Sequence, residues 1–158
     1  MGKMWIKIVI CIALIAFSTS IGYLLSGKYR ARRKFYDQFS LFNERYLNEL
    51  NYARKPLPDF LKQYEYTGDF AKTIKQCVEK RDCNVKLSFL TVEERSACGN
   101  YFSMLGKGDA LSQKSFFGAQ TGALEEKRAD GEKKAKSRGS LYLKLGLLAG
   151  LAIVILII

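Results

Sequence analysis

Two pairs of adjacent carboxylates are the side chains in this sequence best suited to acid–base chemistry, namely Glu93 with Glu94 and Glu125 with Glu126. Two carboxylates that face one substrate can divide the roles of general acid and general base. Neighbouring residues on a helix point in different directions, however, so neither pair can hold one substrate between its members. We therefore expect these carboxylates to be solvated charges.

The composition also gives little support for nucleophilic catalysis or for a metal site. The chain has no histidine, which excludes Ser-His-Asp and Cys-His arrangements and H-E-x-x-H metal sites. Of the four cysteines, Cys11 lies in an apolar run and Cys77, Cys83 and Cys98 lie in the middle of the chain without a C-x-x-C pair. We expect all of them to be reduced, apolar side chains on helix faces. We expect no catalytic, metal-binding or cofactor-binding residue and no enzymatic activity; an enzyme of unusual type would need a lysine or tyrosine in a polar pocket.

The glycine-rich segment LGKGDA at 105–110 has two readings. Such turns can cradle a phosphate, but this one lacks the spacing and the terminal Lys-Ser/Thr of a P-loop. It reads better as a turn between helices, in which Gly106 or Gly108 ends one helix in a left-handed conformation and Asp109 caps the next.

Helical periodicity dominates the elements that would position these groups. Apolar residues recur at gaps of three and four in an amphipathic stripe that continues the first apolar run: Phe35, Phe39, Phe42, Tyr46, Leu50 and Ala53. Pro56 and Pro58 interrupt the helix, and Pro58 can occupy the first turn of the next one.

Two further helices follow from local signals. Asp69, after a break at Thr67 and Gly68, is the expected N-cap of a helix with Phe70 and Ile74 on its apolar face. Thr91 with Glu94 matches a capping box that opens another helix. Residues 81–90 alternate briefly as a strand would, but an isolated strand is not expected. Residues 126–140 are too charged to pack on their own and read as a solvated helix or hinge.

Two segments have the length and composition of membrane helices. Residues 8–25 are uncharged, and residues 141–158 carry only Lys144 as a charge. A helix needs about 20 residues to cross a bilayer core of about 30 Å. The first segment has the alternative of a cleaved signal peptide, but the five cations that follow it favour an uncleaved anchor.

The distribution of charge predicts the orientation. The formal net charge is +11, yet residues 35–125 hold twelve Lys/Arg and twelve Asp/Glu, so the excess lies beside the apolar runs. We assign topology and lipid contact to these basic residues: Lys28, Arg30, Arg32, Arg33, Lys34 and Lys144. They place the middle of the chain in the cytoplasm and both termini on the outer face. The neutral middle argues against nucleic-acid binding.

Each apolar run also has a strip of small residues. Ser18 with Gly22 and Gly146 with Gly150 are spaced four apart, which permits close helix approach. The two strips can pack on each other or on a partner.

The sequence therefore predicts an all-α protein: an antiparallel cytoplasmic helical bundle, residues 27–140, between transmembrane helices at residues 1–26 and 141–158. Oligomeric state, and pairing of the two membrane helices within one chain, stay open.

Several stretches together resemble the stage III sporulation protein AB family of endospore-forming bacteria. They are LNYARKPLPDFL at 50–61, the turn LGKGDA with Gln113 shortly after it, and the terminal LYLKLGLLAGLAIVILII. The resemblance implies a scaffold in the mother-cell membrane around the forespore, within the secretion-like channel that links the two cells. It also implies a helical domain like that of the type II secretion platform protein, with a cytoplasmic ATPase and other channel subunits as partners.

Two other functions are alternatives for this topology, an adaptor and a pore. A general membrane-anchored adaptor or regulator with no transport role predicts the same layout with different partners. A pore made by this chain alone is disfavoured, because the apolar runs have no polar stripe beyond residues 18–20.

Overall fold

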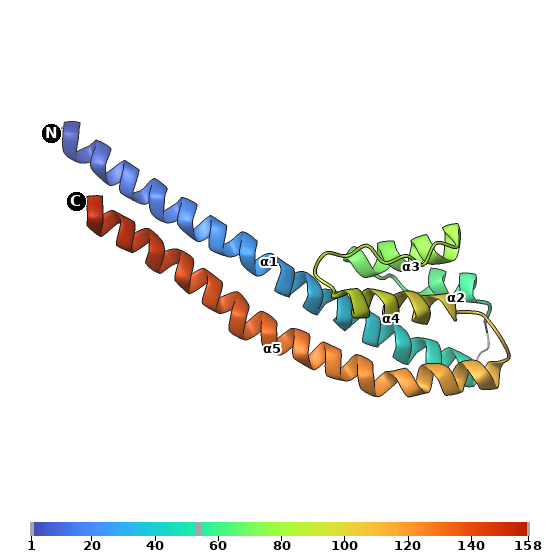
Figure 1. The fold of residues 1–158 in the computed structure, drawn as a ribbon. Coiled ribbons are helices and arrows are strands. Elements are labelled where there is room, and N and C mark those ends of the chain that lie inside the picture. Colours follow the sequence, from blue (N-terminus) through green and yellow to red (C-terminus); the bar gives the residue numbers. More distant parts are fainter. Residues whose placement is uncertain (1, 53–54, 158) are drawn as a thin grey trace. The chain divides into compact units, whose positions relative to one another are not determined.

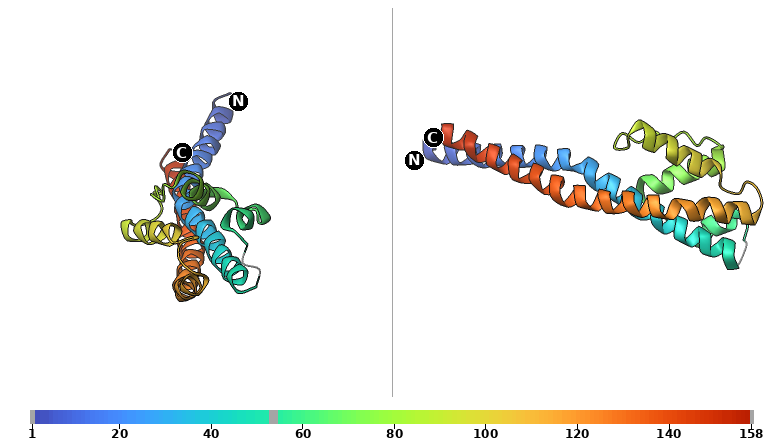
Figure 2. Two further views of the ribbon diagram at one scale, coloured as in Figure 1. Left: turned by 90° about the vertical axis from the view of Figure 1, so that its right-hand side faces the viewer. Right: turned by 60° about the horizontal axis from the view of Figure 1, so that its bottom comes forward.

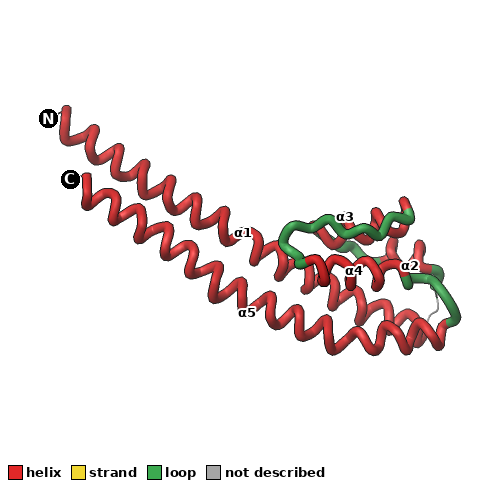
Figure 3. The backbone as a smooth tube through the Cα atoms, in the orientation of Figure 1, coloured by secondary structure: helices red, strands yellow, loops and turns green. Residues whose placement is uncertain are grey.

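The protein is helical throughout the part that the structure describes. The computed structural model describes residues 2–52 and 55–157, with loops but no strand between its helices (Figures 1 and 3). The elements are α1 (Gly2–Tyr52), α2 (Leu57–Gln63), α3 (Gly68–Lys80), α4 (Val92–Ser103) and α5 (Ala110–Ile157). The predicted all-α fold class is confirmed, as is the continuation of the first apolar run into the amphipathic helix. Ala53, at the end of the predicted stripe, lies outside the described residues.

The chain divides into two compact units. Unit 1 consists of residues 2–30 and 132–157, and unit 2 of Ala31–Gly131. The borders predicted at residues 26/27 and 140/141 follow the ends of the apolar runs. The two compact units instead divide at residues 30/31 and 131/132. The long helices α1 and α5 contribute to both units.

Unit 1 is a pair of helical segments that lie side by side in Figure 1 and in the right-hand view of Figure 2. Early residues of α1 meet late residues of α5, since Gly150 lies near Ile15 and Tyr142 near Tyr29. The two segments therefore run in opposite directions. Most of their apolar side chains are exposed, including Leu24 at 74 % and Leu148 at 60 %.

Unit 2 has a core of stacked and edge-to-face aromatic rings. Phe42 and Phe70 are fully buried, with ring centroids 5.6 Å apart, and Phe39 lies 4.7 Å from Tyr101 in an edge-to-face contact. The predicted stripe on α1 supplies one wall of this core, and α2, α3, α4 and α5 supply the others. Such ring pairs contribute about 0.5–1.5 kcal/mol each beyond the burial of their area.

The predicted breaks around α2 and α4 coincide with helix ends. Pro56 precedes α2, its carbonyl accepts the amides of Asp59 and Phe60, and Pro58 lies in the first turn. Thr91 accepts the amide of Glu94 while the Glu94 side chain accepts the amide of Thr91, so both hydrogen bonds of the capping box are present.

The turn before α5 uses both glycines. Gly106 and Gly108 have φ of +69° and +82°, which a side chain would strain. The Asp109 carboxylate accepts the amide of Ser112 at 3.3 Å, at the start of α5.

The prediction that Asp69 is the N-cap of α3 is wrong. Gly68 takes a φ of +67° and begins the helix, so Thr67 occupies the N-cap without a side-chain hydrogen bond. Asp69 lies in the first turn and pairs with Lys72 at 3.9 Å. A carboxylate there still favours the helix dipole.

The prediction that Cys77 and Cys83 are separate reduced thiols is also wrong, because the structure joins them in a disulfide. Arg81 adopts a left-handed conformation at the end of α3, and the chain turns back so that the two Cα atoms lie 4.4 Å apart. Residues 81–90 contain no strand and connect α3 to α4. Cys11 and Cys98 are free.

Candidate functional site

The four small residues of the predicted packing strips come together in unit 1. Ser18 Oγ donates a hydrogen bond of 2.6 Å to the carbonyl of Gly146. A Cβ at Gly22 would lie 2.5 Å from the Tyr142 carbonyl oxygen, and one at Gly150 would lie 3.1 Å from Ile15 Cα. In the structure the two strips therefore lie against each other within one chain.

Two of the basic residues to which the sequence assigned topology and lipid contact, Lys28 and Arg30, lie near aromatic rings of unit 1. The Arg30 guanidinium lies 3.8 Å from the centroid of the Tyr23 ring and donates to the Tyr23 carbonyl at 3.1 Å. Lys28 Nζ lies 5.1 Å from the Tyr29 ring centroid. Lys144 is exposed among the apolar residues of α5, where its long side chain can extend towards a membrane surface.

Arg32 does not have the lipid contact assigned to it. Its side chain is only 11 % exposed, with Nη2 2.6 Å from Glu94 Oε1 and Nη1 2.8 Å from Asp130 Oδ2. Its charge is therefore paired inside unit 2. Arg33 is exposed beside Asp37 at 3.6 Å, and Lys34 is exposed.

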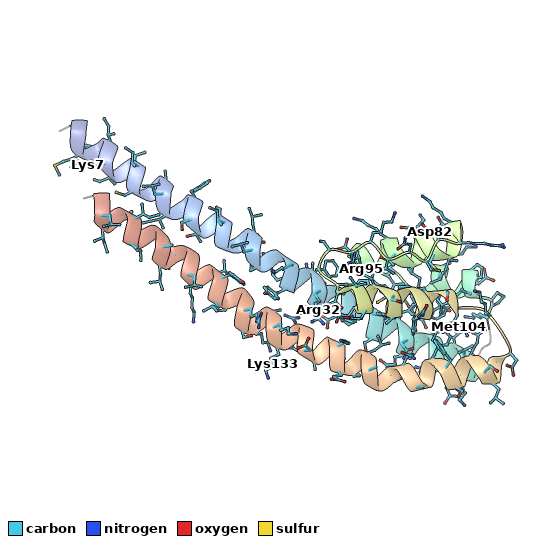
Figure 4. All side chains as sticks on the ribbon, in the orientation of Figure 1. Lys7, Arg32, Asp82, Arg95, Met104 and Lys133 are labelled. Carbon is cyan, nitrogen blue, oxygen red and sulfur yellow. A yellow bond between two sulfur atoms is a disulfide. The ribbon has the colours of Figure 1, made fainter. Side chains whose placement is uncertain are left out.

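Glu94 is the centre of this charge network rather than a solvated carboxylate. Its side chain is 7 % exposed, and Oε1 also lies 3.1 Å from Lys127 Nζ. Burial raises the pKa of Glu94, but hydrogen bonds from Arg32, Thr91 and Lys127 outweigh it and lower this pKa below its ordinary value. The network joins α1, α4 and α5 through the Glu94 carboxylate. Arg32, its partner on α1, is labelled in Figure 4.

A second set of polar contacts crosses the aromatic core. Tyr46 donates to Gln113 Oε1 at 2.5 Å, and Tyr101 donates to Asn43 Oδ1 at 2.8 Å. Asn43 in turn donates to Thr121 at 3.0 Å. Ser40 on α1 also donates a hydrogen bond to the Glu125 carboxylate on α5. These bonds give α1 and α5 a defined register in unit 2.

Unit 2 also has an open groove of ≈ 470 Å³ between α2 and α3. Apolar side chains such as Leu61, Tyr64 and Val78 line it, together with the charged residues Lys75 and Glu79. These charges are mixed in sign, so the groove does not select a partner by charge.

The described side chains also bear on the question of a metal site. Among the residues that the structure describes, no group of three or more His, Cys, Asp or Glu side chains is placed to hold a metal ion. The buried polar groups described above are engaged by partners within unit 2. The capping box was the one sequence signal for Glu94; nothing in the sequence indicated Arg32 or Lys127 as its partners.

Comparison with known proteins gives a family match along nearly the whole chain. The family described as stage III sporulation protein AB matches residues 7–82 and 63–158. No curated protein and no solved structure matches the chain.

Replacing Gly22 with valine should separate the two segments of unit 1. The added Cβ would meet a backbone oxygen that cannot move aside, at a cost of about 1–3 kcal/mol. Energy transfer between fluorescent residues incorporated at positions 6 and 155, both exposed, would follow dissociation during SDS titration in micelles. Gly27→Val is the matched control on the same helix, because a Cβ there meets nothing within 4 Å. Equal SDS midpoints for the two variants would contradict the assigned contact.

Acid should destabilise unit 2 through Glu94. Because the folded state lowers the pKa of this carboxyl, its stabilisation is present above the pKa of the unfolded chain and is lost as pH falls through the folded value. Glu94→Gln should cost about 3 kcal/mol at neutral pH and flatten this acid dependence. Urea unfolding of the full chain in micelles, followed by near-UV circular dichroism, measures both effects. Glu126→Gln, at an exposed position, should leave the profile unchanged; a similar loss in both variants would refute the role of Glu94.

Proposed function

This chain belongs to the stage III sporulation protein AB family, and from that premise we propose that it is a non-enzymatic membrane platform of the channel between mother cell and forespore. Membership implies a role in sporulation, alongside other sporulation proteins. In the proposal, unit 2 offers a docking body to a cytoplasmic ATPase or to other channel subunits, and unit 1 anchors that body in the mother-cell membrane.

The observation that carries the proposal is the contrast between the surfaces of the two units. In the most apolar 18-residue stretches of α1 and α5, only 6 % and 11 % of the stretch is buried within the protein. Helices whose apolar side chains face lipid have such exposed stretches. In unit 2 the aromatic side chains are inside, with Phe60 and Phe117 fully buried. One part therefore suits a membrane and the other suits water, as an anchored platform requires.

The interior of unit 2 supports a structural role for it. In the proposal unit 2 is an antiparallel cytoplasmic bundle, and its polar interior fixes the register of helices rather than serving a reaction. Glu94, the buried carboxylate, is held by Arg32, Lys127 and Thr91. A catalytic carboxylate would instead need access to a substrate.

Both long helices belong to both units, which gives the platform a means of transmission. The backbone hydrogen bonds of α1 and α5 continue from residues of unit 1 into residues of unit 2. A load that an ATPase applies to unit 2 would thus reach unit 1 along continuous helices. The alternative, an adaptor with no transport role, shares this structure and differs in its partners.

Photo-crosslinking in sporulating cells tests the platform proposal. Benzoylphenylalanine at Lys75, beside the groove, and at Lys114, exposed on α5, should capture a sporulation ATPase or a neighbouring channel subunit. The position that gives the product would identify the docking face. The same residue at Leu148, exposed in unit 1, controls for capture within the membrane. Products limited to unrelated membrane proteins would exclude the platform and favour the adaptor.

The orientation makes a separate prediction. If unit 2 is cytoplasmic, Lys107→Cys, in the exposed turn before α5, should react with a membrane-impermeant thiol reagent only after protoplasts are lysed. Met4→Cys, 71 % exposed at the other end of α1's apolar run, should react before lysis. The parent chain measures labelling of the native cysteines. The reverse pattern would overturn the assigned orientation.

A further inference from the structure

Two basic segments that are far apart in the sequence converge at one end of unit 1. A Cβ at Gly139 would lie 3.9 Å from Ser26 Cβ, and the Tyr29 and Tyr142 rings have centroids 5.9 Å apart. These contacts bring residues 27–30 beside residues 138–142. Together, residues 27–30 and 132–144 hold seven Lys/Arg and one acidic residue, Glu132.

The stacked tyrosines form the middle of a small cationic cluster. The rings of Tyr29 and Tyr142 are inclined by 19°. Lys28 Nζ lies 5.1 Å from the Tyr29 ring centroid. Arg138 precedes Gly139, where a Cβ would lie 3.9 Å from Ser26 Cβ, so its backbone is close to that of residues 27–30. A hydrogen bond with Arg138 is the largest of the causes that lower the pKa of Tyr29. An ammonium and a guanidinium therefore lie close to one pair of stacked phenol rings.

The position of this cluster along α1 matches the edge of a bilayer. Twenty-one residues separate Lys7 from Lys28, which is about 31 Å along a helix and close to the thickness of a hydrocarbon core. Lys7 and Lys133 lie towards opposite ends of unit 1 (Figure 4). Tyrosine is favoured at this depth because its ring is apolar and its hydroxyl is polar.

We propose that Lys28, Tyr29, Arg138 and Tyr142 form a binding site for the phosphate of one anionic phospholipid of the phosphatidylglycerol type. The guanidinium can donate two parallel hydrogen bonds to phosphate oxygens, and the ammonium adds a second positive charge. Arg30 is not assigned to the site, because its guanidinium contacts the ring and carbonyl of Tyr23 rather than the stacked pair of Tyr29 and Tyr142. The site requires unit 1 to lie in a membrane but does not depend on the docking of an ATPase.

Native mass spectrometry of the full chain, released from micelles with phosphatidylglycerol and phosphatidylcholine in equal amounts, tests the site. The chain should retain phosphatidylglycerol in preference. Lys28→Gln or Arg138→Gln should each weaken its retention about fivefold, the equivalent of about 1 kcal/mol for one cation. All of these positions are on the surface of unit 1, and the energy-transfer assay described above shows whether the segments stay paired.

Two variants separate a site from diffuse attraction. Lys133→Gln removes the same charge from α5, but position 133 is five residues from Arg138 and so about 140° around the helix. Lys7→Gln removes a charge from the other end of α1's apolar run. Both should retain the lipid as the unchanged chain does. Equal losses in Arg138→Gln and Lys133→Gln, or no preference for phosphatidylglycerol, would overturn the proposal.

Soluble glycerol phosphate distinguishes a lipid from a free phosphate as the source of the ligand. An excess of it should leave the retained phosphatidylglycerol in place, because the acyl chains also contact the apolar surface of unit 1. Displacement of the lipid by glycerol phosphate at comparable concentration would show a site for free phosphate and would refute the lipid assignment.

Discussion

The buried carboxylate of Glu94 is the point at which charged and polar groups from three helices of unit 2 meet. Removing a charge from water costs several kcal/mol, and this cost is offset only where cations and hydrogen-bond donors surround it. The groups that meet Glu94 come from α1 through Arg32, from α5 through Lys127, and from the N-cap of α4 through Thr91. Burial of the aromatic rings stabilises unit 2, but such rings can pack in several ways at similar cost. The polar contacts of Glu94 and Asn43 can form in only one register of the helices, and so they favour that register.

Unit 1 reaches a defined register by different means. Lipid chains are as apolar as leucine, so no hydrophobic force drives two helices together within a membrane. Close backbone contact at Gly22 and Gly146, with the hydrogen bond from Ser18, takes its place. A steric constraint in unit 1 and an electrostatic one in unit 2 thus act on the same two helices, α1 and α5.

Local signals made much of this fold predictable. The stripe from Phe35 to Tyr46, the prolines before α2 and the capping box at Thr91 all act over a few residues, and each has the predicted place in the structure. Glu94 shows the limit, since its contact with Thr91 spans three residues, whereas Arg32 lies 62 positions away. The Cys77–Cys83 disulfide was missed because it depends on the reversal at Arg81, in a segment with no periodicity. Asp69 was misplaced because a left-handed glycine, Gly68, begins α3 before it.

The partners of the buried polar groups bear on function as well as on folding. An enzyme keeps at least one polar group accessible and poised, often with a pKa moved towards the working pH. In unit 2 the shifts go the other way: Glu94 is held in its charged form, and burial raises the pKa of the Cys98 thiol to about 12, which keeps it protonated. The exposed faces of unit 2 and the basic end of unit 1 are the places where polar side chains are accessible from outside the protein.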